Sequence, residues 1–317
     1  MPVRTDTDMQ RGYFIRKNEP VPDGIRRIMA YQLKVASYHA EKMAEHSDRP
    51  VHEFRKCMKR IRSLLRLVRN ETGYCQYRTL NATFRDISRK LSTLRDLYVF
   101  RSLLQEMKQE ASPLPDPSVL QALDRHFRTL YGEAMAKISE NRALPAELKQ
   151  DIGRLETLPG ELKLAGQEFL IVKDGLQRIY RSGRKAFFYA REFPSTENFH
   201  SLRKRVKDLW HASLILYHAW PDMMILMNHV LKQASDELGK EHDLAMLQSC
   251  LDENPIPGTG HARLRKLNRQ IMSRRSRLQS SILEQAARIY TETPSVFASR
   301  MQTYWEITRN EPDRLSG

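Results

Sequence analysis

The sequence predicts an all-α protein, and three observations carry that prediction. Glycine is scarce, with 13 among 317 residues. Runs that alternate apolar and polar residues, as half-buried strands do, are absent. Apolar residues instead recur at spacings of three and four, which places them on one face of a helix. We therefore expect long antiparallel helices along nearly the whole chain.

Composition narrows the class of partner. A hydrophobic content of 40% is enough to build a real core. The formal net charge of +15 and a pI near 9.8 favour anionic partners such as nucleic acid, an acidic membrane face or a free polyanion. No signal-peptide block and no run of about 18 apolar residues occurs, so we expect no membrane insertion and a cytoplasmic location.

The first strongly amphipathic helix is predicted over VHEFRKCMKRIRSLLRLVRN, residues 51–70. Its apolar face consists of Phe54, Cys57, Met58, Ile61, Leu64, Leu65 and Val68. Its polar face consists of His52, Arg55, Lys56, Lys59, Arg62 and Arg66. An ordinary solvated face carries interspersed acids, and residues 54–70 contain none. This difference favours an anion-binding surface over a solvated face.

Stretches rich in helix-breaking residues divide the rest of the chain. They are residues 112–118 (SPLPDPS), 144–147 (LPAE), 193–196 (FPST) and 253–261 (ENPIPGTGH). The segments between them have roughly the lengths usual for bundle helices, about 15 to 30 residues.

An internal repeat links the two halves of the chain. Residues 51–65 align without gaps with residues 199–213. The alignment matches His52 with His200, Arg55 with Arg203, Lys56 with Lys204, and Lys59 with Lys207. It extends to GIRRIMAYQLK (24–34) with GLQRIYRSGRK (175–185), and to LSTLRDL (91–97) with LGKEHDL (238–244). We infer a tandem duplication with repeats over 18–165 and 166–310, and flexible ends at 1–17 and 311–317.

Each repeat carries a basic stripe that begins with a histidine. Arginine presents a planar fork to phosphate oxygens and lysine a flexible point charge, so a mixture can hold a phosphate chain in many registers. His52 and His200 lie near predicted helix starts, where the dipole attracts anions and an imidazole can donate to phosphate. A lone histidine more often caps or packs. Recurrence of the whole pattern favours two stripes that face a long anion across a shared groove.

Some residues outside the stripes are candidates for the same site. Tyr180, Arg184 and Lys185 share a helical face in IYRSGRKAF, and Lys34 is the first repeat's match to Lys185. Asp96 and Asp243 are equivalent and are predicted to orient a cation, because a general base would need a nucleophile that the sequence does not supply. The seven Lys or Arg within acid-free residues 254–283 form either a second contact surface or a solvated face.

Together these motifs resemble the CHAD family, the conserved histidine α-helical domain. The likeness rests on HEFRKCMKRIR, HSLRKRVKDLW, LRDL, EHDL, YRSGRKAF and YTETPSVFASRMQTYW, and spans about residues 20–308. The resemblance implies two similar antiparallel four-helix bundles around a pseudo-two-fold axis, with a basic central channel that binds inorganic polyphosphate. It places on that channel His52, Arg55, Lys56, Lys59, His200, Arg203, Lys204 and Lys207, with Arg184 and Lys185 as contributors.

We therefore expect a polyphosphate-binding protein, associated with polyphosphate granules and without a cofactor. The chain has no Gly-rich P-loop, H-E-x-x-H or E-x-E-x-K motif, so we predict no catalytic residue, no metal site and no enzymatic activity. The alternative is a nucleic-acid-binding helical protein. Single-strand binding usually needs aromatic rings among the cations, and residues 52–70 offer only Phe54, on the apolar side.

Overall fold

The computed structural model describes residues 12–45, 48–109, 116–140, 143–253 and 261–311, and the residues within these ranges include no strand. The longer helices are α1 (Val21–Glu41), α2 (Asp48–Leu67), α4 (Tyr74–Arg89), α5 (Ser92–Gln109), α6 (Pro117–Glu140), α7 (Ala143–Gly153), α9 (Leu170–Glu192), α10 (Thr196–Ile215), α11 (Pro221–Glu253), α12 (His261–Ile289) and α13 (Pro294–Asn310). Short turns of helix are η2 (Lys42–Glu45), α3 (Arg69–Thr72), α8 (Leu158–Glu161) and η3 (Tyr217–Ala219). The all-α prediction is confirmed.

The predicted helix breaks have mixed outcomes. The break at 193–196 is confirmed, because α9 ends at Glu192 and α10 begins at Thr196. The break at 144–147 is wrong, since α7 runs through it. Pro145 lies in the first turn of α7, where a backbone N–H has no partner within the helix, so proline is tolerated there. Much of the other two stretches lies outside the described residues.

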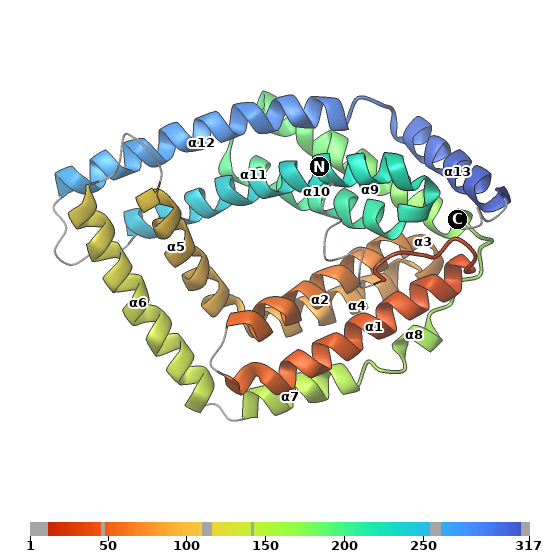
Figure 1. The fold of residues 1–317 in the computed structure, drawn as a ribbon, viewed down its shortest axis with the longest axis horizontal. Coiled ribbons are helices and arrows are strands. Elements are labelled where there is room, and N and C mark those ends of the chain that lie inside the picture. The colour runs from red at the N-terminus through yellow and green to blue at the C-terminus, as the bar shows by residue number, and fades with distance from the viewer. Residues whose placement is uncertain (1–11, 46–47, 110–115, 141–142, 254–260, 312–317) are drawn as a thin grey trace, which may run out of the picture.

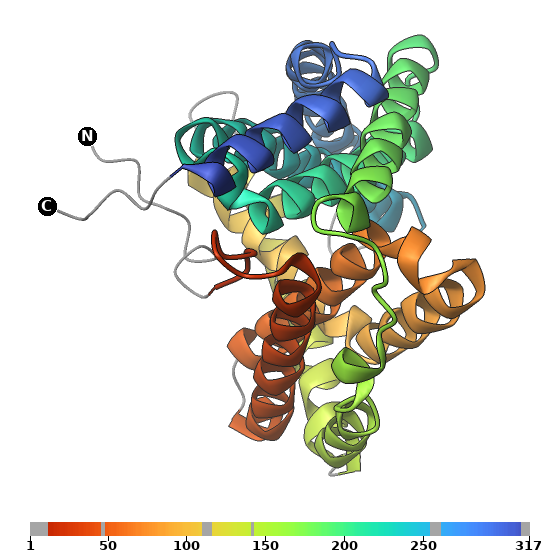
Figure 2. The same cartoon turned by 90° about the vertical axis from the view of Figure 1, so that its right-hand side faces the viewer.

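The two His-led helices meet near the centre of the molecule. Figure 2 shows α1, α2, α4 and α7 in the lower half and α9, α10, α12 and α13 in the upper half. Helix α2 packs against α1 and α4 and also against α9 and α10. Figure 1 shows α2 below α10, and the two helices are in contact. Segments far apart in the sequence are therefore joined through α2.

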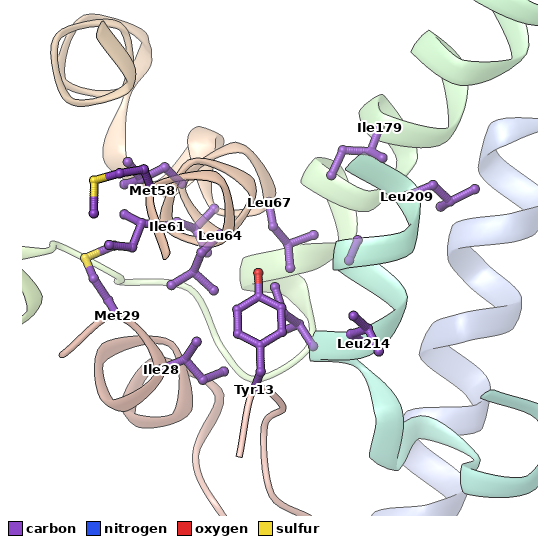
Figure 3. Packing of buried hydrophobic residues seen from close by; sticks show 14 of the residues in the cluster. Tyr13, Ile28, Met29, Met58, Ile61, Leu64, Leu67, Ile179, Leu209 and Leu214 are labelled. Carbon is purple, nitrogen blue, oxygen red and sulfur yellow. The ribbon is translucent and has the colours of Figure 1, made fainter. Parts of the chain in front are cut away.

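Burial of the apolar face of α2 explains its central position. Ile61 and Leu64 have no exposed surface, and Figure 3 shows them beside Met29 of α1. Tyr13 lies between these side chains and Leu214 of α10 in the same view. Each fully buried aliphatic side chain contributes roughly 1.5 to 3 kcal/mol of transfer free energy. The apolar face thus holds α2 in place and directs its charged face outward.

The prediction of a loose N-terminal end does not hold for residues 12–17. Tyr13 and Ile15 are fully buried, and the Tyr13 hydroxyl donates to the Arg60 carbonyl oxygen at 3.1 Å. The Ile15 amide donates to the carbonyl oxygen of Ile215 at 2.9 Å. Two apolar side chains in a polar segment were enough to anchor it across both halves. Residues 1–11 and 312–317 lie outside the described residues.

The buried apolar residues form two clusters, and neither coincides with a predicted repeat. The larger cluster combines side chains of α1 and α2 with side chains of α9 and α10. The smaller one joins Phe100 of α5 and Leu123 of α6 to Leu247 of α11 and Ile271 of α12. Both clusters draw on helices from either side of residue 165, so the proposed repeats share their cores.

A close approach between α9 and α2 depends on Gly175. A Cβ added at Gly175 would lie 1.6 Å from the backbone oxygen of Leu67, so the two helices would have to separate. We expect Gly175→Ala to lower the free energy of unfolding by about 3 kcal/mol, measured by urea denaturation.

The matched control is Gly239→Ala in α11. A Cβ there would meet no heavy atom of the described residues within 4 Å. Because alanine is the better helix former, this variant should be unchanged or more stable by up to about 1 kcal/mol. Equal stability of the two variants would contradict the close approach.

Candidate functional site

Helices α2 and α10 have the same length and the same polar pattern. Each contains 20 residues, and α10 begins at Thr196, 148 positions after the start of α2 at Asp48. His52 and His200 are both the fifth residue of their helix. The Ser195 side chain caps α10 and accepts a hydrogen bond from the Asn198 amide at 3.2 Å.

An ion pair joins the two helices directly. Arg66 of α2 donates to the carboxylate of Asp208 of α10, and Arg205 contacts the other carboxylate oxygen at 3.2 Å. Burial raises the pKa of the Asp208 carboxyl, while the charges of Arg66 and Arg205 act in the opposite direction. The predicted role of Arg66 as a phosphate ligand is therefore shared with a structural one, because a buried carboxylate already engages its guanidinium.

The cations of α2 and α10 act on the same buried ring. Burial lowers the pKa of His211 well below its ordinary value, and the charges of Arg60, Lys207 and Lys59 lower it further. Lys59 belongs to α2 and Lys207 to α10. Both charges therefore lie within electrostatic reach of His211, since electrostatic influence falls off with distance.

Cations of both helices also act on Lys204 of α10. Although Lys204 is exposed, desolvation of its ammonium by neighbouring groups lowers its pKa, and the charges of Arg205, Arg203 and Arg62 lower it further. Arg62 again comes from α2. These observations define a basic cluster where α2 and α10 meet. It is composed of Lys59, Arg62 and Arg66 from α2 and His200, Arg203, Lys204 and Lys207 from α10.

The polar face of α2 also contacts α4. Arg62 Nε donates to Asn81 Oδ1 at 3.0 Å, and Arg55 donates to the Ser88 carbonyl oxygen at 2.7 Å. These bonds fix the positions of the two arginine side chains. His52 is exposed and Lys56 half-buried on the same helix. Their membership in the basic cluster stays a prediction.

Tyr180 lies inside the protein. Its side chain is buried, and its hydroxyl donates to the carbonyl oxygen of Ile289 at 2.9 Å and accepts from the Glu292 amide at 3.2 Å. Burial raises the pKa of Tyr180 to about 12. Tyr180 thus ties α9 to the end of α12, and its supporting role at the site stays a prediction.

Whether Lys34, Arg184 and Lys185 contribute to the basic cluster stays a prediction. Arg184 lies 4.9 Å from the ring centroid of Phe188, and Lys185 Nζ lies 5.6 Å from that of Tyr189. Both rings are one turn further along α9. Lys34 is exposed on α1 and lines a cavity of about 390 Å³. Within the described residues, no hydrogen bond or ion pair connects Lys34, Arg184 or Lys185 to the basic cluster.

The predicted acids lie on α5 and α11. Asp96 is exposed and Asp243 is half-buried. Their role in orienting a cation stays a prediction. Beside Asp243, however, His242 of α11 stacks on His200 with ring centroids 4.4 Å apart.

Sequence reasoning missed His242, although the repeat contained a signal for it. In the alignment of LSTLRDL with LGKEHDL, His242 stands where the first repeat has Arg95. A histidine in place of a cation beside an aligned aspartate marks a position able to carry positive charge.

The predicted site residues can be compared with a large cavity, possible metal sites and possible membrane spans. A cavity of about 840 Å³ lies between α5, α11 and α12, and no predicted site residue lines it. Across the described ranges, no group of three His, Cys, Asp or Glu side chains is placed to hold a metal ion. No helix there is both long enough and apolar enough to span a bilayer.

The family assignment follows from comparison with known proteins. A family model for the CHAD domain matches residues 27–252, which is more than half of the 317 residues. The chain belongs to the CHAD family. The match includes all of α2 and α10 and thus the whole basic cluster, whereas α12 and α13 of this CHAD protein lie beyond it. A search of curated proteins found none similar to the chain.

The buried histidine predicts how stability depends on pH. His211 is neutral in the folded CHAD protein because its pKa is depressed, whereas the unfolded chain binds a proton there below about 6.5. The free energy of unfolding should therefore fall as the pH drops below about 6.5, with His211 contributing up to about 1.4 kcal/mol per pH unit.

Urea denaturation between pH 5 and pH 7 measures this slope. His211→Phe should make it shallower by roughly the contribution of one histidine. His229→Phe, at an exposed position on α11, is the control and should keep the wild-type slope. Identical slopes for the wild type and His211→Phe would mean that His211 is protonated in the folded protein.

Proposed function

We propose that this CHAD protein binds inorganic polyphosphate, with the phosphate chain lying along the basic cluster. The observation that supports this most is the joint effect of cations from α2 and α10 on His211 and Lys204. Because these cations act on shared groups, their positive potentials add in the empty protein. An anion with about one negative charge per unit is attracted by that combined potential along its length.

The side chains of the cluster suit phosphate oxygens. Arginines present paired N–H groups and lysines present mobile ammonium groups, so successive phosphates need no fixed register. Neutralised phosphates release their counterions, and affinity should therefore rise with chain length and fall steeply with salt. Beyond the cluster, His52, Arg55 and Lys56 would extend the same track along α2, with Arg184 and Lys185 as further contributors.

The proposal includes a larger arrangement. We place polyphosphate in a basic central channel between two similar four-helix bundles, related by a pseudo-two-fold axis after a tandem duplication. The equal lengths of α2 and α10 and the matching positions of their histidines support it. The shared cores would then hold the two copies in one unit.

We further propose that the protein binds polyphosphate without cleaving it. The cluster combines cations with one buried carboxylate, and Asp208 is already engaged by two arginines. That leaves no acid in the cluster in a position to act on a bound phosphate. Association with cytoplasmic polyphosphate granules would follow from binding alone.

A competition titration tests the ligand class. Labelled long-chain polyphosphate is bound at about physiological salt and challenged with DNA, RNA, heparin, ATP and short polyphosphate. We expect only long polyphosphate to compete at low concentration. Equal competition by nucleic acid would favour the alternative function, a nucleic-acid-binding protein.

A second assay tests for catalysis. The protein is incubated with polyphosphate and Mg²⁺ or Mn²⁺, and free phosphate is measured. We expect no release above background. Metal-dependent release that disappears on substitution of Asp96 or Asp243 would overturn the binding-only proposal.

A further inference from the structure

Two histidines from different helices stack at the edge of the basic cluster. The rings of His200 on α10 and His242 on α11 have centroids 4.4 Å apart and planes 31° apart. Both residues are partly exposed, so an anion can reach them. The Nδ1 atom of each ring is buried and has no hydrogen-bond partner among the described residues.

The charges around the pair are mostly positive. The groups that act most strongly on His242 come from α10, namely Arg203, His200, Lys204 and Lys207. Burial is the larger cause, and together they lower the pKa of His242 to about 3. Burial followed by Lys204 and Arg203 lowers the pKa of His200 as well. The pair is therefore neutral at neutral pH while the site is empty.

Helix α11 itself and the helices packed against it also carry ionisable residues. On α11 itself, Glu241 accepts from Arg275 and Gln279 of α12 at 3.1 and 2.9 Å, so its charge is already engaged. Asp243 follows His242 on α11. The ionisable residues on α5, which also packs against α11, include Asp96, Arg101, Glu106 and Lys108.

A polyanion changes this balance. Phosphate oxygens beside the rings neutralise the surrounding cations and accept hydrogen bonds, and both effects favour the charged form of an imidazole. The positive charge of an imidazolium also strengthens the hydrogen bond that a ring N–H donates to a phosphate oxygen. Two positive rings at 4.4 Å would repel each other, so one proton is shared by the pair.

We propose that polyphosphate binding draws one proton from solvent onto the His200–His242 pair, which makes His242 a further phosphate-binding residue. The inference rests on the proposed function. The proton comes from water or buffer, and no covalent bond changes. By linkage, affinity rises as the pH falls, by up to about tenfold per pH unit while the pair is neutral in the free protein and charged in the complex.

Calorimetric titration of the full chain with long-chain polyphosphate measures the proton directly. The titration is run at pH 7 in two buffers with different ionisation enthalpies, and the difference in heat gives the number of protons taken up. Long chains are used because terminal phosphates titrate near pH 6 and would otherwise contribute. We expect an uptake close to one proton for the wild type.

The double variant His200→Gln/His242→Gln should bind with an uptake near zero, because glutamine donates without titrating. The control is His126→Gln/His229→Gln, on α6 and on another face of α11, which should keep the wild-type uptake. From pH 8 to pH 6 the dissociation constant of the wild type should tighten by about tenfold or more, and that of the double variant should change much less.

The outcomes separate the two proposals. Tight binding by the wild type with equal heats in both buffers would overturn the proton-uptake inference and leave the proposed function intact. Uptake that persists in His200→Gln/His242→Gln would also overturn the inference, because the proton would then reside elsewhere. No binding in either buffer would overturn the proposed function itself.

Discussion

Replacing Lys59 and Lys204 together with glutamine is expected to weaken polyphosphate binding by about a hundredfold at physiological salt. Each lysine belongs to a different helix of the basic cluster, and both side chains are exposed, so folding should be little affected. A hydrogen bond to a charged group contributes about 1.5 to 3 kcal/mol, and 1.4 kcal/mol corresponds to a tenfold change in affinity.

The salt dependence gives an independent measure of the same loss. Removing two phosphate contacts should reduce the slope of log affinity against log salt by about 1.5. Fluorescence titration at several salt concentrations yields both the affinity and the slope.

The matched control for this double variant is Lys266→Gln with Arg269→Gln. Both residues are exposed on α12, outside the residues matched by the CHAD family. We expect this variant to lose less than about threefold in affinity, since distant exposed charges are screened at physiological salt. Equal losses in both double variants would mean that diffuse surface charge, and no defined cluster, accounts for binding.

Asp208→Ala is expected to lower the free energy of unfolding by about 3 to 5 kcal/mol. Asp208 is 7% exposed and contacts both Arg66 and Arg205. Its removal leaves these cations partly buried, beside Arg62 and Lys204, with no opposing charge. Thermal or urea denaturation without ligand measures the loss.

Polyphosphate should partly restore the stability of Asp208→Ala. The anion replaces the missing negative charge, so its affinity for the variant should exceed that for the wild type by roughly tenfold, for about 1.4 kcal/mol of relieved repulsion. The shift of the melting temperature at a fixed polyphosphate concentration should therefore be larger for the variant. A smaller shift would place the bound anion away from Asp208.

The control for Asp208→Ala is Asp86→Ala on α4. Asp86 forms exposed ion pairs with Arg85 at 2.9 Å and Arg89 at 3.4 Å. Exposed pairs contribute about 0 to 1 kcal/mol, so little change in stability is expected. A comparable loss in both variants would show that burial of the Asp208 pair carries no special weight.

The sequence located the basic residues of α10 and of the second half of α2 before their spatial relation was known. His200, Arg203, Lys204 and Lys207 follow one helical face, and the structure brings them to the cations of α2. Tyr180 shared a helical face with Arg184 in the sequence, but a four-residue spacing also fits a buried position. Only packing against neighbouring rings, such as Phe297 at 4.2 Å, shows that this tyrosine is internal.

His242, in contrast, was not found from the sequence pattern. It stands outside the His-led stripe, on a helix whose apolar pattern gave no sign of a site. The relevant contact joins residues 200 and 242 through the packing of α11 on α10. A single sequence does not encode that distance in any periodicity, because the contact depends on how two helices cross.

The sequence by itself determined that the chain is helical and basic, and it located the stripe on α2 and its match on α10. These properties arise within one or two turns, where apolar spacing and side-chain charge act locally. The tertiary structure decided which cations lie near one another and that Asp208 pairs with Arg66. It also decided that residues 12–17 are anchored and that each apolar cluster combines residues from before and after residue 165. These features depend on contacts between segments far apart in the sequence, and such contacts form only when apolar faces pack.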